Sequence, residues 1–292
     1  MRSLRFLTLS TALLATAACD SVETTDVSAS TLSVAGELPG TVRQYGQPVR
    51  VGNGRARSYA ILDQQNNGTP VEIGVALDED ALEGLAPPMN HAAAGGSEHE
   101  HMGMQEYLLP LPVNHGTQFK FIELDWNPAG HEPPGIYDIP HFDFHFYSIT
   151  REQRDAIVPS DPEFMKKAAN FPAADLVPAA YMVLPPAPAP VPAVPKMGVH
   201  WSNLTSPEIQ PPNSPNYAPF THTFIYGSWD GQFTFAEPMI TRAFLLTKPD
   251  VTVPLSPAAR YVEGTYSAGS YRIRWDARAR EYRVALSSLT KR

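Results

Sequence analysis

The chain has 292 residues, a formal net charge of −8 and a single cysteine, Cys19. An acidic chain without a basic cluster argues against nucleic acid as a partner. One cysteine excludes an internal disulfide, a multi-thiolate zinc site and an iron–sulfur cluster. The 30 prolines are typical of short strands joined by many loops.

The N-terminus has the three parts of a secretory signal. Arg2 and Arg5 are positive, an apolar segment follows, and small residues precede Cys19. The apolar segment is shorter than the roughly 20 residues of a transmembrane helix. The sequence ATAAC resembles a bacterial lipobox, which implies that the signal peptide of residues 1–18 is removed and that Cys19 is lipidated. An A-x-A cleavage site at residues 15–17 is the alternative, and it would release a secreted protein.

These features predict an exported lipoprotein on the cell membrane or the periplasmic face of the envelope. The polar residues 19–38 are expected to form a flexible tether behind the lipid. Residues 39–292 are expected to form one β-rich domain. The membrane is therefore an expected partner through the lipid anchor. The sequence is also compatible with a homo-oligomer, and it defines no small-molecule partner.

Most elements expected along the domain are strands, because β-branched and aromatic residues alternate with polar ones between turn sequences. The expected strands lie within residues 41–77, on both sides of a QNNGTP turn, and at 119–126, 141–150, 220–226, 232–237, 271–275 and 282–286. The last four form two hairpins. Short helices are expected at 78–85, from Thr150, and at 160–170. The fold class is therefore mainly β: an antiparallel sandwich or barrel with two or three short helices.

Two segments of biased composition interrupt the strands. Residues 86–104 are rich in Gly, Ala, His and Met, and are expected to form a flexible low-complexity loop. Histidines and methionines together would also suit copper. The sequence PPAPAPVPAVP at 185–195 is expected to be an extended polyproline crossing. We place this crossing within one domain, because the histidines before and after it are interpreted as parts of one site.

The stretch HEPPGIYDIPHFDFHFY carries the candidate chemistry. In a strand, His141, Asp143 and His145 share one face, and the intervening phenylalanines share the other. Two imidazoles and a carboxylate at this spacing can converge on one divalent metal ion, either zinc or iron or manganese. His131 and Glu132 lie upstream, where a Pro-Pro-Gly turn can fold them back over the strand. A half-exposed strand with phenylalanine inward and histidine outward is the alternative.

Three more residues are candidate metal ligands. His200 follows the proline segment, His222 begins a hairpin, and Glu237 closes the second strand of that hairpin. A histidine beside aromatic residues is often a core residue bonded to the backbone, which is the alternative for His200 and His222. A carboxylate in an aromatic strand must be paired, bound to metal or at the rim. Glu132 and Asp143 are the candidate catalytic residues, as further ligands or as general bases for a metal-bound water.

Three blocks, HEPPGIYDIPHFDFHFY, GVHW and HTFIYGSWDGQFTFAEPMIT, together resemble an uncharacterised bacterial family of exported proteins. This family is identified as domain of unknown function 5602, typified by a Thermus hypothetical protein. The resemblance covers about residues 40–250. It implies that the blocks form one unit, and it implies no activity. A weaker similarity to cupins rests on the spacing of Gly135 and His141, but Asp143 stands where the second cupin histidine belongs.

Three functions are compatible with these residues. The first is a metal-dependent hydrolase or oxygenase. The second is a non-catalytic binding module of the cell envelope, in which the metal is structural or absent. The third is a structural or assembly protein with the histidine strand at a subunit interface. A water-accessible site with one open coordination position would favour catalysis, whereas a closed four-ligand site would favour a structural role.

Overall fold

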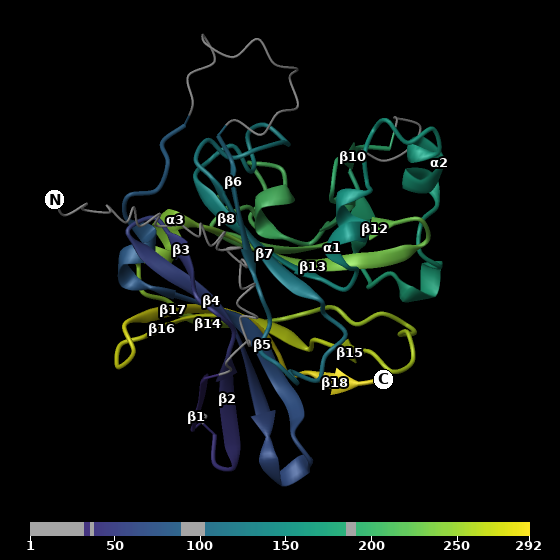
Figure 1. Ribbon diagram of the computed structural model, residues 1–292. Coiled ribbons are helices and arrows are strands. Elements are labelled where there is room, and N and C mark those ends of the chain that lie inside the picture. Colours follow the sequence, from purple (N-terminus) through teal and green to yellow (C-terminus); the bar gives the residue numbers. More distant parts are fainter. Residues whose placement is uncertain (1–31, 36–37, 89–102, 185–190) are drawn as a thin grey trace, which may run out of the picture.

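The computed structural model describes residues 32–35, 38–88, 103–184 and 191–292, and they form two antiparallel sheets that face each other (Figure 1). The strands of the first sheet are β1 (Leu32–Ala35), β2 (Thr41–Tyr45), β3 (Val49–Val51), β4 (Gly54–Asp63), β5 (Thr69–Asp78), β14 (Asp250–Pro254), β16 (Ser270–Asp276) and β17 (Glu281–Ser287). Their order is β1-β2-β4-β5-β17-β16-β14, with β3 beside β4.

The second sheet holds the histidine-rich strand near its centre. Its strands are β6 (Gln105–Leu109), β7 (Phe121–Asn127), β8 (His141–Tyr147), β9 (Tyr181–Val183), β10 (Ala193–Val194), β11 (Gly198–Asn203), β12 (His222–Trp229) and β13 (Gln232–Thr241). Their order is β10-β11-β12-β13-β8-β7-β6, with β9 beside β11. Two short strands, β15 (Tyr266–Ser267) and β18 (Thr290–Lys291), pair separately.

Short helices lie in the connections between strands. The described α-helices are α1 (Arg151–Asp155), α2 (Phe164–Ala169) and α3 (Arg242–Leu246). The 3-10 helices are η1 (Gln64–Asn66), η2 (Glu79–Leu82), η4 (Ala174–Leu176) and η5 (Pro207–Ile209). The expected fold class, mainly β with short helices, is therefore confirmed. Because both sheets are open, the fold is a sandwich and not a barrel.

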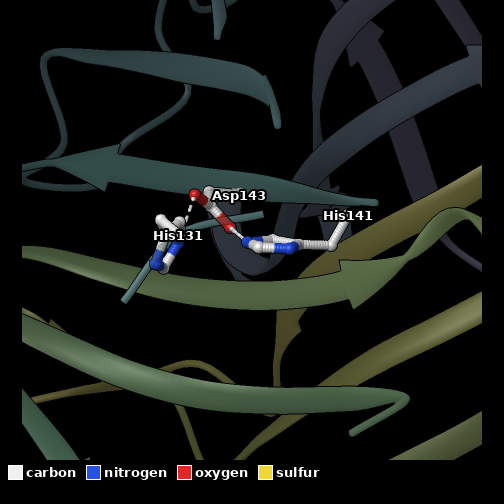
Figure 2. Close-up of side chains that lie close together, drawn as sticks. All are labelled: His131, His141 and Asp143. Atoms are coloured by element: carbon white, nitrogen blue, oxygen red, sulfur yellow. Dashed lines mark ion pairs between the residues drawn. The ribbon is translucent and has the colours of Figure 1, made fainter. Parts of the chain in front are cut away.

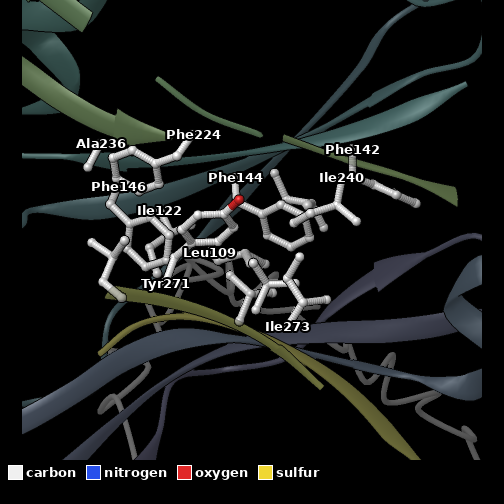
Figure 3. Close-up of a cluster of buried hydrophobic side chains, with 14 of the residues drawn as sticks. Leu109, Ile122, Phe142, Phe144, Phe146, Phe224, Ala236, Ile240, Tyr271 and Ile273 are labelled. Atoms are coloured by element: carbon white, nitrogen blue, oxygen red, sulfur yellow. The ribbon is translucent and has the colours of Figure 1, made fainter. Parts of the chain in front are cut away.

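The core lies between the two sheets (Figure 3). Phe142, Phe144 and Phe146 of β8 are fully buried in it. Tyr271 and Ile273 of β16 approach them from the opposite sheet, as Figure 3 shows. The alternation predicted for β8 is thus confirmed on its apolar side.

Two expected helices form as predicted, with small differences in extent. Thr150 caps α1 through a capping box with Gln153. Asp78 caps a 3-10 helix in place of the expected α-helix, and its carboxylate accepts a hydrogen bond from the backbone of Ala81 at 3.0 Å. The helix expected from residue 160 begins at Phe164, because Asp161 first closes a turn with the backbone of Glu163.

Other expectations differ more, or fall outside the described residues. Within the expected tether, residues 32–35 form strand β1 and pair with β2, which shortens the segment available as a tether. The end of the expected polyproline crossing forms β10, which pairs with β11. Residues 1–31, 36–37, 89–102 and 185–190 lie outside the described part of the chain, and with them the signal peptide, Cys19 and most of the expected tether. Among the described helices, none is long and apolar enough to cross a membrane.

We expect Phe144→Ala to lower the free energy of unfolding by about 3–5 kcal/mol, because it leaves a cavity in the packed core. Urea denaturation of the mature protein measures this loss. Phe171→Ala is the matched control, since that ring is 40% exposed and its loss should cost no more than about 1 kcal/mol. Equal losses in the two variants would contradict the assigned facing of β8.

Candidate metal centre

The second face of β7 and β8 is polar, yet it is buried. Because side chains alternate along a strand, Glu123 and Asp125 of β7 lie on the same face as His141, Asp143 and His145 of β8. None of these five residues is more than 3% exposed. The half-exposed strand with its histidines in solvent is therefore wrong.

The segments that follow β8 cover this face. An apolar cluster on it joins Tyr147 of β8 and Phe235 of β13 to Ile157 and Phe164 from the region of α1 and α2. Arg154 of α1 forms an ion pair with Glu123. The polar side chains are thus enclosed by aliphatic and aromatic neighbours, where water cannot screen their charges.

Negative charge exceeds positive charge within this enclosure. Its buried carboxylates are Glu123, Asp125, Asp143 and Glu237. Among the described residues of this face, Arg154 is the buried permanent cation, and it is shared between Glu123 and the partly exposed Glu106. Burial and the charge of Asp125 raise the pKa of Glu123 to about 7 in spite of that arginine. Because an unpaired buried charge is very costly, the other carboxylates require protons, imidazolium ions or metal ions.

The first histidine–carboxylate group joins a loop to β8. Figure 2 shows the carboxylate of Asp143 between the imidazoles of His131 and His141. The Nε2 atom of His131 lies 3.3 Å from Oδ2, and that of His141 lies 3.1 Å from Oδ1. The potential ligand atoms of the three residues all lie within 4.8 Å of one another. They are thus close enough to share one ion.

The second nitrogen of each imidazole contacts a backbone carbonyl. Nδ1 of His141 lies 2.6 Å from the oxygen of Ile139, and Nδ1 of His131 lies 2.7 Å from that of Glu132. A carbonyl only accepts, so Nδ1 is the donor and a neutral ring keeps its lone pair on Nε2. Both lone pairs then face the same carboxylate, which is the orientation found in metal-binding histidines.

The buried atoms at this group are poorly satisfied by the protein. Nε2 of His141 and Oδ1 of Asp143 make no hydrogen bond within the described part of the chain. The other carboxylate oxygen of Asp143 accepts a hydrogen bond from the side chain of Asn127 at 2.7 Å. A cation between the two Nε2 atoms and Oδ1 would satisfy the remaining atoms, so the donor set fits a metal ion.

A proton can occupy the same position as the metal. Burial opposes protonation of His131, but the hydrogen bond and charge of Asp143 outweigh it and raise its pKa to about 9. Burial alone would raise the pKa of Asp143, but the charge of His141 and the contact and charge of His131 hold it well below its ordinary value. Metal binding must therefore displace a proton from His131 at neutral pH.

The structure divides most of the predicted ligands and catalytic residues into two groups. The side chains of His222 and Glu132 belong to neither group. His145, His200 and Glu237 form the second group, beside the one at Asp143. The ring of His222 lies elsewhere, with Nδ1 2.8 Å from the hydroxyl of Tyr271 in the opposite sheet. The side chain of Glu132 is exposed, and the residue contributes its backbone carbonyl to the site.

Sequence reasoning missed the carboxylates of β7. Glu123 lies opposite His145, and Asp125 lies opposite Asp143. Their segment, FIELDWN, alternates apolar and polar residues in the same way as HFDFHFY. This shared alternation could have indicated that the carboxylates of β7 lie on the same face as the histidines of β8.

These features define an antiparallel β-sandwich with a buried histidine–carboxylate face. The chain is similar to the family described as TTHB210-like, hypothetical protein TTHB210, whose model matches residues 66–126. The match supports the resemblance to an uncharacterised family of Thermus type, and it does not test the number 5602. It includes Glu123 and Asp125 and ends before β8. No curated protein and no solved structure matches the chain.

In the metal-free protein, we expect the His131–Asp143 pair to stabilise the fold by up to about 3 kcal/mol. This contribution is complete below pH 6.5, the ordinary histidine pKa, and is lost as the pH rises through about 9, because His131 then deprotonates. Urea denaturation of chelator-treated protein across this range measures it. His131→Gln should remove most of the pH dependence. An unchanged pH dependence in that variant would assign the effect to another group.

Proposed function

We propose that the protein is an exported envelope lipoprotein whose β-sandwich binds a divalent metal ion through His131, His141 and Asp143. The observation that carries the metal site is the pair of Nδ1–carbonyl contacts, which direct two Nε2 atoms at one carboxylate. Two histidines and a carboxylate form the ligand set of many zinc sites and of non-haem iron sites. Zinc is the first candidate ion, followed by iron or manganese.

The burial of the site favours a structural role for the metal. The side chains of His141 and Asp143 are 0% and 4% exposed, and that of His131 is 19% exposed. His131 belongs to the loop between β7 and β8, whereas the other two ligands belong to β8 itself. A bound ion would therefore fasten this loop to the sheet, which suits a non-catalytic envelope module.

The ligand count favours a metal-dependent hydrolase or oxygenase as the second candidate. Three protein ligands leave at least one coordination position for water or substrate. Asp143 would then act as a ligand, because an imidazole faces each of its oxygens. Proton relaxation of water in the Mn²⁺-loaded protein separates the two roles. A rapidly exchanging bound water would favour catalysis, and its absence would favour the structural role.

The export and anchoring parts of the proposal rest on the sequence around Cys19. The positive residues, the apolar segment and the small residues before the cysteine support secretion, and ATAAC supports lipidation. The membrane is then the partner through the lipid. The polar segment between Cys19 and strand β1 would separate the domain from the membrane surface.

We expect His141→Ala to lose one equivalent of bound metal relative to the wild-type protein. Its buried imidazole, whose Nε2 lies 3.1 Å from Oδ1 of Asp143, would supply one of the three ligands. Elemental analysis after dialysis against buffered Zn²⁺ measures the stoichiometry. His222→Ala is the matched control, because that imidazole contacts Tyr271 and should leave the metal content unchanged. Full metal content in His141→Ala would refute the first site.

We expect Cys19→Ser to abolish membrane association while leaving export intact, because serine cannot accept the lipid. Fractionation of producing bacterial cells, with detection of the protein in membrane and soluble extracytoplasmic fractions, measures the change. Ser21→Ala is the control and should remain with the membrane. A Cys19→Ser protein that still sediments with membranes would show that something other than the lipid holds it there.

A further inference from the structure

A second histidine–carboxylate–histidine arrangement lies on the same face of the sheet. Nε2 of His145 is 3.3 Å from Oε1 of Glu237, and Nε2 of His200 is 3.9 Å from Oε2. The potential ligand atoms of these residues also lie within 4.8 Å of one another. As at Asp143, two imidazoles face different oxygens of one carboxylate. The residues come from three strands, β8, β11 and β13.

The far side of the His145 ring faces a second carboxylate. Its Nδ1 lies 3.3 Å from Oδ2 of Asp125, which is 0% exposed. When Nδ1–H is directed at Asp125, a neutral ring has its Nε2 lone pair directed at Glu237. A carboxylate that orients a histidine in this way is typical of metal sites, where it fixes the tautomer and strengthens the ligand.

The described protein atoms leave hydrogen-bonding atoms of this group without partners, and a single added proton would not balance the charges of its two carboxylates. Both ring nitrogens of His145, both carboxylate oxygens of Asp125 and Oε2 of Glu237 make no hydrogen bond with the described residues. An imidazolium at His145 would neutralise one of its two flanking carboxylates and leave the other charged. The nearby Arg154 is already engaged by Glu123. A divalent cation at Nε2 would instead balance Glu237 while Asp125 keeps its Nδ1–H contact.

We propose that His145, His200 and Glu237 bind a second divalent cation, with Asp125 as a positioning residue. The nitrogen-rich donor set selects zinc or another transition metal over calcium or magnesium, which prefer oxygen ligands. His200, whose side chain is 25% exposed, forms the solvent side of this site. The proposal does not rest on the first site, since the two ligand sets share no residue.

Zinc titration of the metal-free mature protein tests this proposal. With Zn²⁺ as the probe, calorimetry and elemental analysis should give two equivalents for the wild type and one for His200→Ala. His141→Ala should also give one, and the double variant should give none. His200→Ala is the preferred variant because the partly exposed ring can be removed with little loss of packing. Its folding is verified by its thermal melting curve.

The outcomes separate the two sites. Two equivalents in His200→Ala would overturn the second site, and so would a single wild-type equivalent that His141→Ala removes. A single equivalent that His200→Ala removes and His141→Ala retains would support the second site and refute the first. His222→Ala serves again as the control for loss of an imidazole away from both sites.

The positioning role of Asp125 has its own readout. Asp125→Asn should keep the Co²⁺ stoichiometry, weaken binding at the second site by about 10–100-fold, and shift the visible absorption of the bound Co²⁺. A role in packing alone would change the melting temperature without moving the spectrum. Asp250→Asn, at a side chain that is 67% exposed, is the matched control. Unchanged affinity and spectrum in Asp125→Asn would remove Asp125 from the site.

Discussion

The balance of charge on one face of the second sheet constrains much of the surrounding structure. Four carboxylates are buried there beside one arginine of the described chain, and a face of this composition requires protons, imidazolium ions or metal ions. The loop before β8 supplies His131, and β11 supplies His200. A loop and a further strand thus bring nitrogen atoms to carboxylates that the histidines of β8 do not neutralise alone.

The polar face is coupled to the apolar core through strand β8. Its phenylalanines pack between the sheets, and its histidines and Asp143 lie on the reverse side. A shift of one residue in register would exchange the two sets, burying imidazoles between the sheets and phenylalanine among carboxylates. Packing of Phe144 therefore also places Asp143 and His145. The core supplies stability that has no directional preference, and the polar face adds directional contacts.

The sequence predicted features that depend on a local pattern of residues. It predicted less well the features that depend on which strands pair and in which register. Alternation within β8 predicted both of its faces, and Thr150 predicted the start of α1. The facing of His222 depends on a β-bulge between Gly227 and Ser228, which pairs Glu237 with Ile225. Without the bulge, the register from the turn would place His222 and Glu237 on one face, as ligands of one ion would have to be. Asp125 joined the site only through the pairing of β7 with β8, which no local pattern specifies.

The exposure of the two outer histidines has a kinetic consequence. His131 and His200 are the partly exposed members of their groups, while the residues behind them are almost fully enclosed. An ion could leave the first site only after His131 swings outward with its loop. Its residence time would then follow the rate of this local opening, and a chelator in excess would remove it no faster. Such an ion would be acquired as the chain folds and then retained through wide changes in the concentration of free metal around the protein.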